Sequence, residues 1–375
     1  MQFIYENYEI KDEELCNIIK DNKSIQKYFK TSFNHIIPNN YCGFISQNSK
    51  TFFILPKIAN NTDTNFNIFL YMLMFAYDIN LSNKDLHQAS TNKHKLLEIF
   101  IQYFTNNLLQ ELKRGVYKSY ITKEENLKVL KGKYVVIKNF SNFYHQNIYC
   151  EYDDFSSDNS LNQLFLYAIK EFKKISNNKN LYLLETILDD VTYIHQNINS
   201  LNIVFNRLNS RFKKSFDIAL ILLKHLISIP NSGKDKSIAF MFNMAEVFEK
   251  FIGKLNKEID SSTKLQVKRN FGSLQLKPDI LTKDKIIDTK YKLISNRDDL
   301  AVNDKYQMFT YGVNFKIKDT MLLYPKHIKN IHLDLKLGSN DNLINLKLRS
   351  IDLNFYGEYE EFVSEIKKRL KEIIV

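Results

Sequence analysis

Apolar residues recur every three or four positions in several stretches of the chain, and this spacing is typical of helices. One stretch runs from His94 to Gly115, and its apolar positions are Leu96, Leu97, Phe100, Ile101, Phe104, Leu108 and Leu109. Residues 67–79 form another apolar run, which predicts a second buried helix. A third helix is expected after Ser157 or Asp158, either of which could act as its N-cap.

Shorter apolar runs next to proline and glycine predict strands. Residues 51–58 read as a strand that Pro56 interrupts, and residues 133–140 read as a strand that follows Gly132. The first 150 residues therefore mix helices and strands, whereas residues 151–232 are mainly helical.

The last third of the chain has a different order of elements. A strong helix is predicted over Ala239–Leu255, followed by strands over residues 265–269, 274–281 and 285–294, a helix over 304–311, a strand over 320–325 and a final helix from about residue 357. Alternation of this kind predicts an α/β (α+β) fold with a mixed sheet.

Three consecutive regions follow from these patterns. We expect an N-terminal α+β domain over residues 1–150, a helical region over 151–232 and the mixed-sheet core over 233–375. The segment Pro230–Ser237 contains Pro, Gly and Ser and is the best candidate for a linker.

Composition narrows the choice of partners only partly. Lys and Arg outnumber Asp and Glu by 53 to 42, a net charge of +11. A basic surface suits nucleic acid, although a coding bias toward Lys and Asn would give the same surplus. Three scattered cysteines favour a reducing compartment. The N-terminus lacks a secretory signal and the apolar runs are too short to span a bilayer, so we expect a cytoplasmic protein without membrane contact.

The stretch "LKPDILTKDKIIDTKYKLI" places charge inside two apolar strands. Asp288 and Lys290 lie two residues apart and so share a face, with Ile286 beneath them. Antiparallel pairing can bring Asp279 beside Asp288. Pro278 cannot donate a ladder hydrogen bond, which favours an edge or a strand start there.

Two adjacent carboxylates repel each other unless a proton or a cation lies between them. Oxygen ligands with open water positions suit Mg²⁺, which lowers the pKa of a bound water and neutralises phosphate charge. Lys290 would stabilise the transition state of phosphodiester cleavage. The alternative is a surface hairpin with an ordinary Lys–Asp salt bridge.

Two further residues strengthen the nuclease interpretation. On a helix with about 100° per residue, Glu249 falls within the apolar arc, between Ala245 and Phe242. A buried carboxylate needs a metal ion or a Lys as partner; alternatively, its stem packs while its head reaches water. Gln307, on the helix after the hairpin, could bind the attacking water or the Lys, or could be simply solvated.

In combination, these motifs resemble the McrC-like subunits of modification-dependent (5-methylcytosine) restriction systems. The matching segments, in chain order, are "RGVYKSYI", "LKGKYVVIKNF", "CEYDDFSSDNSLNQ", "NMAEVFEKFI", "LKPDI…IIDTKYK" and "NDKYQMFTYG". They span about Arg114 to Pro325, and the first hundred residues have no counterpart that we can place.

The resemblance implies a restriction-endonuclease-like PD-(D/E)xK core in the C-terminal part. It implies that Glu249, Asp279, Asp288 and Lys290 are catalytic, with Gln307 as an accessory residue, and that Glu249, Asp279 and Asp288 bind Mg²⁺. It also implies that the substrate is double-stranded DNA. The expected partner is an AAA+ GTPase ring subunit, contacted and stimulated by the N-terminal part.

Three functions therefore remain open from the sequence. The chain is a metal-dependent endonuclease subunit of a McrBC-like system, or a regulatory module of an AAA+ GTPase with an inactive nuclease site. The third possibility is a stand-alone nuclease of the same fold.

Overall fold

The computed structural model describes residues 2–32, 35–47, 50–142, 146–198, 200–229, 237–292, 294, 296, 298–326, 330–339 and 342–374. The described chain divides into two compact units, Met1–Thr91 with His225–Val375, and Asn92–Lys224. This division differs from the three consecutive regions expected from sequence, because the first unit is built from both ends of the chain. Except for Ser237, the predicted linker Pro230–Ser237 lies outside the described residues.

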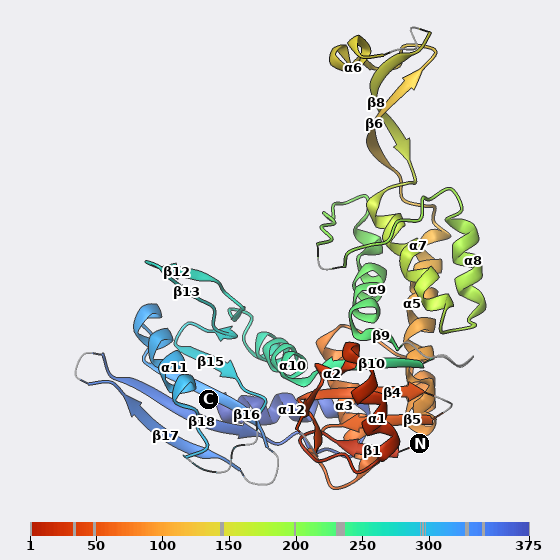
Figure 1. Ribbon diagram of the computed structural model, residues 1–375. Helices are drawn as coiled ribbons and strands as arrows, with labels where there is room; N and C mark the ends of the chain where they lie inside the picture. The colour runs from red at the N-terminus through yellow and green to blue at the C-terminus, as the bar shows by residue number, and fades with distance from the viewer. Residues whose placement is uncertain are drawn as a thin grey trace. The chain divides into compact units, whose positions relative to one another are not determined.

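The first sheet of this unit joins strands that are far apart in sequence (Figure 1). Its order is β1-β5-β4-β10-β9, with bounds β1 Gln2–Tyr5, β5 Lys50–Leu55, β4 Tyr41–Gln47, β10 Ser237–Asn243 and β9 Leu226–Ile229. The pair β1–β5 is parallel, and the other pairs are antiparallel. Strand β10 therefore ties the C-terminal third of the chain to its first fifty residues.

Helices cover both faces of this sheet. Helices α1 (Glu13–Asp21) and α2 (Lys23–Gln26) share one core with Ala239 and Met241 of β10. Helix α3 (Thr62–Ala76) packs on the other face, where Phe69 meets Phe242 at a ring distance of 6.2 Å. The remaining elements here are the short strands β2 (Phe29–Thr31) and β3 (Ile36–Pro38) and helix α4 (Asn83–Thr91).

The helix predicted over Ala239–Leu255 is wrong in its first five residues. They form strand β10, and helix α10 spans Met244–Ile259, with the Asn243 side chain accepting from the amide of Ala245. Because β10 is covered on both faces, all four residues from Ala239 to Phe242 are apolar and buried. A fully buried strand of this kind has no alternation and cannot be told from a helix by periodicity.

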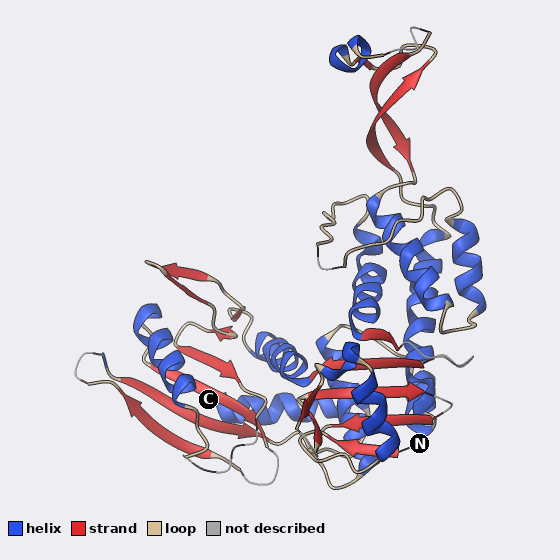
Figure 2. Cartoon of the chain, in the orientation of Figure 1, coloured by secondary structure: helices blue, strands red, loops and turns tan. Residues whose placement is uncertain are grey.

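The second sheet is mixed, as predicted. Its order is β11-β14-β15-β16-β18-β17, with bounds β11 Lys264–Leu265, β14 Ile280–Leu281, β15 Lys285–Thr289, β16 Asp319–Pro325, β18 Ile344–Ile351 and β17 His332–Leu337. Strands β15, β16 and β18 are parallel, whereas the outer pairs are antiparallel. Figure 2 shows helices beside this sheet as well as beside the first one.

Helix α11 (Val302–Phe315) covers one face of the second sheet through Met308 and Tyr311. Helices α10 and α12 (Tyr359–Ile374) contact strands of the sheet and pack on each other, with Phe251 and Phe362 stacked at 5.7 Å. The chain is thus a mixed α+β protein.

The strands predicted over residues 265–269 and 274–281 are more fragmented in the structure than expected. The stretch 265–281 contains β11, the separate ribbon of β12 (Arg269–Phe271) and β13 (Leu274–Leu276), and then β14. Gln266 has a positive φ of 52°, which ends β11. Strand β15 ends at Thr289, earlier than the predicted Ile294.

The second unit is mainly helical. Its helices are α5 Leu96–Leu112, α7 Ser160–Lys173, α8 Lys179–Ile187 and α9 Lys213–His225, with short 3₁₀ turns at Lys93–Lys95 and Ser210–Phe212. The N-cap of α7 is Asn159, rather than the predicted Ser157 or Asp158. No helix in the part of the chain that the structure describes has the length and apolar character needed to cross a membrane.

A long hairpin extends from the helices of the second unit (Figure 1). It consists of the paired strands β6 (Ser119–Leu127) and β8 (Ile148–Ser156). The short strand β7 (Lys133–Tyr134), in the connection between them, also pairs with β8. The strand predicted over residues 133–140 is therefore wrong beyond Tyr134, because Val136–Phe140 forms the short helix α6.

Candidate active site

The β14–β15 hairpin brings the two predicted aspartates together. Ile280 pairs with Ile287 and Leu281 with Ile286, so the same register places Asp279 opposite Asp288. The turn is closed by Thr282, whose amide donates to the Lys285 carbonyl at 3.0 Å. Strand β14 lies between β11 and β15, so Pro278 precedes an inner strand rather than an edge.

Asp288 and Lys290 share a face, as the strand spacing predicted. Lys290 Nζ lies 2.6 Å from Asp288 Oδ2. Asp288 is 2% exposed and Ile286 is fully buried in the core below. The amide of Lys290 donates to the Leu323 carbonyl of the neighbouring strand, which fixes the backbone at this point.

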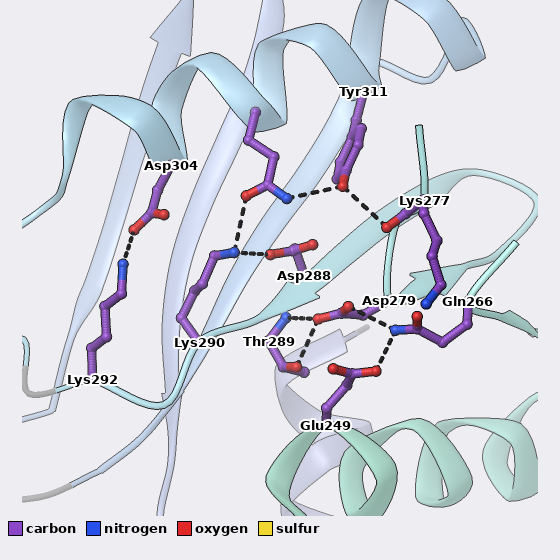
Figure 3. A network of polar contacts seen from close by, with 11 residues as sticks. Glu249, Gln266, Lys277, Asp279, Asp288, Thr289, Lys290, Lys292, Asp304 and Tyr311 are labelled. Atoms are coloured by element: carbon purple, nitrogen blue, oxygen red, sulfur yellow. Dashed lines mark hydrogen bonds and ion pairs between the residues drawn. The ribbon is translucent and has the colours of Figure 1, made fainter. Parts of the chain in front are cut away.

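Asp279 is held by two residues that sequence reasoning missed (Figure 3). Its Oδ2 accepts from both the amide and the hydroxyl of Thr289, each at 2.8 Å. Its Oδ1 accepts from Gln266 Nε2 at 2.9 Å. Thr289 lies within the Asp-Thr-Lys stretch and could have been noticed, whereas nothing local in the sequence singles out Gln266.

Glu249 enters the site from helix α10, on the inward face that its helical position predicted. Its side chain is half-buried, and Gln266 Nε2 donates to Glu249 Oε1. The same amide nitrogen therefore lies between Glu249 and Asp279 (Figure 3). A neutral donor satisfies the two carboxylates in part but does not cancel their charge.

Burial and mutual repulsion perturb the acids of this cluster. Burial raises the pKa of Glu249 to about 7, with the neighbouring Asp279 carboxylate as the second cause. Burial likewise raises the pKa of Asp288 to about 6, again with Asp279 next in importance and Lys290 opposing. The site thus holds more negative charge than the lysine alone compensates.

Gln307 binds Lys290, which is one of the roles that the sequence analysis considered for it. Lys290 Nζ donates to Gln307 Oε1 at 2.9 Å, and Gln307 Nε2 donates to the Tyr311 hydroxyl at 2.9 Å. The Tyr311 hydroxyl donates in turn to the Lys277 carbonyl at 3.1 Å. These hydrogen bonds connect helix α11 to the segment before Asp279. Tyr311 is thus a site residue that the sequence analysis did not identify.

The side-chain oxygens of this cluster are suitable ligands for a hard divalent cation. Asp279, Asp288 and Glu249 supply only oxygen ligands, and the buried Asp288 Oδ2 has Lys290 Nζ beside it at 2.6 Å. As the side chains stand, no three His, Cys, Asp or Glu groups among the described residues converge enough to hold a metal ion. The amide of Gln266 lies between two of the three carboxylates.

A comparison with protein families gives a match over most of the chain. Residues 36–325 match the family described as McrBC 5-methylcytosine restriction system component. The match begins well before Arg114, so it includes much of the N-terminal region for which the sequence analysis found no counterpart. A search of curated proteins found no match.

A comparison with solved structures gives a similar fold. A chain from a refined half-complex of a tetradecameric assembly of Thermococcus gammatolerans McrB AAA+ hexamers with bound McrC aligns with a TM-score of 0.59 and 19% identity, over 100% of both chains. A chain of the cryo-EM structure of the Thermococcus gammatolerans McrBC complex aligns with a TM-score of 0.46 and 24% identity, over 68% of this chain and 87% of that one. Because the family match covers most of the sequence, the chain belongs to the McrBC 5-methylcytosine restriction system component family.

Proposed function

We propose that this chain is the endonuclease subunit of a McrBC-like restriction system and cleaves phosphodiester bonds of double-stranded DNA. The observation that carries the proposal is the convergence of Asp279, Asp288 and Lys290 on one hairpin, with Glu249 linked to Asp279 through Gln266. On this proposal, the second sheet with α10 and α11 is a PD-(D/E)xK nuclease core.

Asp279, Asp288 and Glu249 are the residues that would hold Mg²⁺. When bound, Mg²⁺ supplies a more acidic water and positive charge beside the phosphate. The chain's own contribution is positional: Lys290 presents an ammonium next to the acids, and Gln307 holds that ammonium in place at 2.9 Å. The raised pKa values of Glu249 and Asp288 support the proposal, because burial and the neighbouring Asp279 carboxylate outweigh the nearby lysines.

Positive charge near the site supports a nucleic-acid substrate. Exposed cations lie at both ends of the β12–β13 ribbon: Lys268 directly precedes it, Arg269 is its first residue, and Lys277 directly follows it. Arg269 also lies over the Phe315 ring at 5.4 Å, and Phe271 packs on the same ring at 5.0 Å. These contacts fix the ribbon on α11, so its cations can bind phosphates from a defined position.

We also propose that an AAA+ GTPase ring subunit is the partner and that this chain stimulates its hydrolysis in the cytoplasm. The structural relative was solved in an assembly of McrB AAA+ hexamers with bound McrC. In this chain, the connection between β6 and β8 exposes large apolar side chains within the twelve residues 129–140, namely Val129, Leu130, Val136, Ile137 and Phe140. A clustered set of this kind is typical of a protein-binding surface.

The decisive experiment combines the chain with its AAA+ partner, GTP, MgCl₂ and methylated plasmid DNA. Replacing Asp288 by Asn should abolish cleavage, with a loss of at least about a thousandfold, because the central carboxylate is lost. The matched control is Asp284→Asn in the exposed turn of the same hairpin, which should cut normally. Adding EDTA in excess over Mg²⁺ should stop the wild-type reaction.

Three outcomes separate the possible functions. Equal cleavage by Asp288→Asn and wild type would reject the assigned active site. GTPase stimulation without any Mg²⁺-dependent cutting would indicate the regulatory module with an inactive site. Cutting that is as fast without the AAA+ protein as with it would indicate a stand-alone nuclease.

A further inference from the structure

Tyr291, the residue after Lys290, is held by segments from three parts of the first unit. Its side chain is 4% exposed, and its hydroxyl donates to Glu6 Oε1 at 2.5 Å. Its carbonyl accepts from Asn40 Nδ2 at 2.9 Å. Its ring lies 5.9 Å from that of Phe248, which precedes Glu249 on helix α10. The end of the catalytic strand is therefore tied to the N-terminal sheet and to α10.

Asn40 contacts both the segment that follows strand β15 and the first residue of helix α10. Its side-chain amide binds the carbonyl of Tyr291, directly after Lys290. Its own carbonyl accepts from the amide of Met244, the first residue of α10, at 2.8 Å. One residue outside the active site thus connects the strand of Lys290 with the start of the helix of Glu249.

The N-terminal side of this contact is firmly anchored. Glu6 is 1% exposed, directly follows β1, and donates its amide to the Leu55 carbonyl at 3.0 Å. Asn40 directly precedes β4, whose first residue, Tyr41, pairs with Asn243 of β10. The hydrogen bonds on Tyr291 therefore come from residues next to β1 and β4, two strands that both pair with β5 in the first sheet.

We propose that Asn40 is a positioning residue: its side chain fixes the backbone after Lys290 relative to α10, so that Lys290 and Glu249 keep their positions beside the two aspartates. This inference rests on the nuclease function proposed above. It assigns part of the N-terminal sheet a role in the geometry of the cutting site. A displacement of about 1 Å in a reacting group can lower a rate by up to a hundredfold, so one hydrogen bond at this point can have a measurable effect.

Two variants of the full chain test the proposal. Asn40→Asp keeps the shape and the Oδ1 acceptor but replaces the amide donor by an oxygen that repels the Tyr291 carbonyl. Asn40→Ala removes the side chain and leaves the backbone carbonyl that binds Met244. The matched control is Asn67→Ala, another half-buried asparagine of the same unit, which accepts from Ser90 Oγ at 2.9 Å.

We expect both Asn40 variants, assayed with the AAA+ partner, GTP and MgCl₂, to lower kcat for plasmid cleavage by about tenfold with the KM for DNA unchanged. Hydrogen exchange of the full chain should quicken about fivefold in peptides covering residues 244–250 and 286–292. Asn67→Ala should change neither readout. A general loss of stability would also lower the apparent kcat at unchanged KM, but it would quicken exchange along the whole chain and not only in these two peptides.

The two readouts keep this inference distinct from the proposed function. If the wild-type chain does not cut DNA, the nuclease assignment fails, while the exchange measurement still tests the contact made by Asn40. Wild-type exchange in both peptides of the Asn40 variants would overturn the proposal. So would faster exchange combined with an unchanged kcat, because the contact would then be structural without positioning the site.

Discussion

At the scale of single residues, Lys290 is the cation on which the charge of the site depends. It lies 2.6 Å from Asp288, which is almost fully buried. Lys290→Met should therefore leave an unpaired buried carboxylate and lower the free energy of unfolding by roughly 3 kcal/mol at pH 8. Urea denaturation followed by circular dichroism measures this loss.

A double variant isolates the cause of that loss. Adding Asp288→Asn to Lys290→Met removes the uncompensated charge and should restore most of the lost stability. Lys367→Met is the comparison: its ammonium pairs with Glu258 at 2.9 Å and both side chains are more than a third exposed, so its loss should be smaller. Equal losses in both single variants would contradict this account.

Glu6 should make the stability of the protein depend on pH. Burial raises the pKa of Glu6 from 4.5 to about 7, against the hydrogen bond from Tyr291. The folded state then binds this proton more tightly than the unfolded state, so the contribution is complete below pH 4.5 and is lost as the pH rises through about 7. Over that window the loss is roughly 3 kcal/mol.

The neutral variant Glu6→Gln imitates the protonated acid and tests this sign. It should match the wild type near pH 5 and be the more stable protein at pH 8, as measured by urea midpoints at each pH. Parallel stability curves for the two proteins would show that the Glu6 carboxyl does not titrate between these values.

The residues of the site were predictable from sequence to the extent that their chemistry is local. Asp288 and Lys290 follow from strand alternation, and Glu249 follows from its place in a helical apolar arc. Gln266 and Tyr311 did not follow, because each acts through a partner more than ten residues away. A hydrogen bond between distant segments leaves no periodic trace in the sequence.

At the scale of elements, the predicted boundary between β10 and α10 is wrong because the strand is buried on both faces of its sheet. The pattern of strand β10 predicts a helix because both faces of its sheet are covered, so its apolar run lacks alternation. The prediction of helix α10 is confirmed from Met244 onward, because one side of this helix is polar and its apolar residues keep the helical spacing. Thus patterning identified the element that carries Glu249 but not the strand that anchors it.

The segment "DNSLN" shows how a motif can be structural. Asn159 caps helix α7, and its amide donates to the Tyr117 carbonyl at 3.1 Å. Asn162, which is fully buried, donates to the same carbonyl at 2.8 Å and to the Ser157 carbonyl at 2.7 Å. The two asparagines hold the base of the β6–β8 hairpin, so this part of the family resemblance reflects how the hairpin is attached.

The β12–β13 ribbon should contribute to DNA affinity through phosphate contacts. Lys268→Gln should weaken binding equally for all DNA sequences and reduce the slope of log K against log salt by about 1. Fluorescence anisotropy with labelled duplexes at several KCl concentrations measures the slope. Lys371→Gln, an exposed lysine of α12, is the control and should leave it unchanged. An unaltered slope for Lys268→Gln would place the DNA elsewhere.

At the scale of the whole molecule, the chain leaves the first unit at Thr91 and returns to it at His225. Sequence patterns suggested consecutive regions because they register changes in composition along the chain. They carry no information on strand pairing between its two ends, such as β10 beside β4. The C-terminal third therefore appeared self-contained although its first strand belongs to the N-terminal sheet.

This organisation predicts which fragments can fold. Residues 92–224 have their own core, with Phe104 against Phe172 at 5.4 Å, and should fold alone with a cooperative thermal transition. Residues 225–375 alone should not, because β10 would lose β4, and Tyr291 would lose Glu6 and Asn40. Residues 1–91 joined to 225–375 by a flexible Gly-Ser linker restore those partners and should regain a cooperative transition. A cooperative transition in the isolated 225–375 fragment would mean that the N-terminal sheet is dispensable for the fold around Lys290.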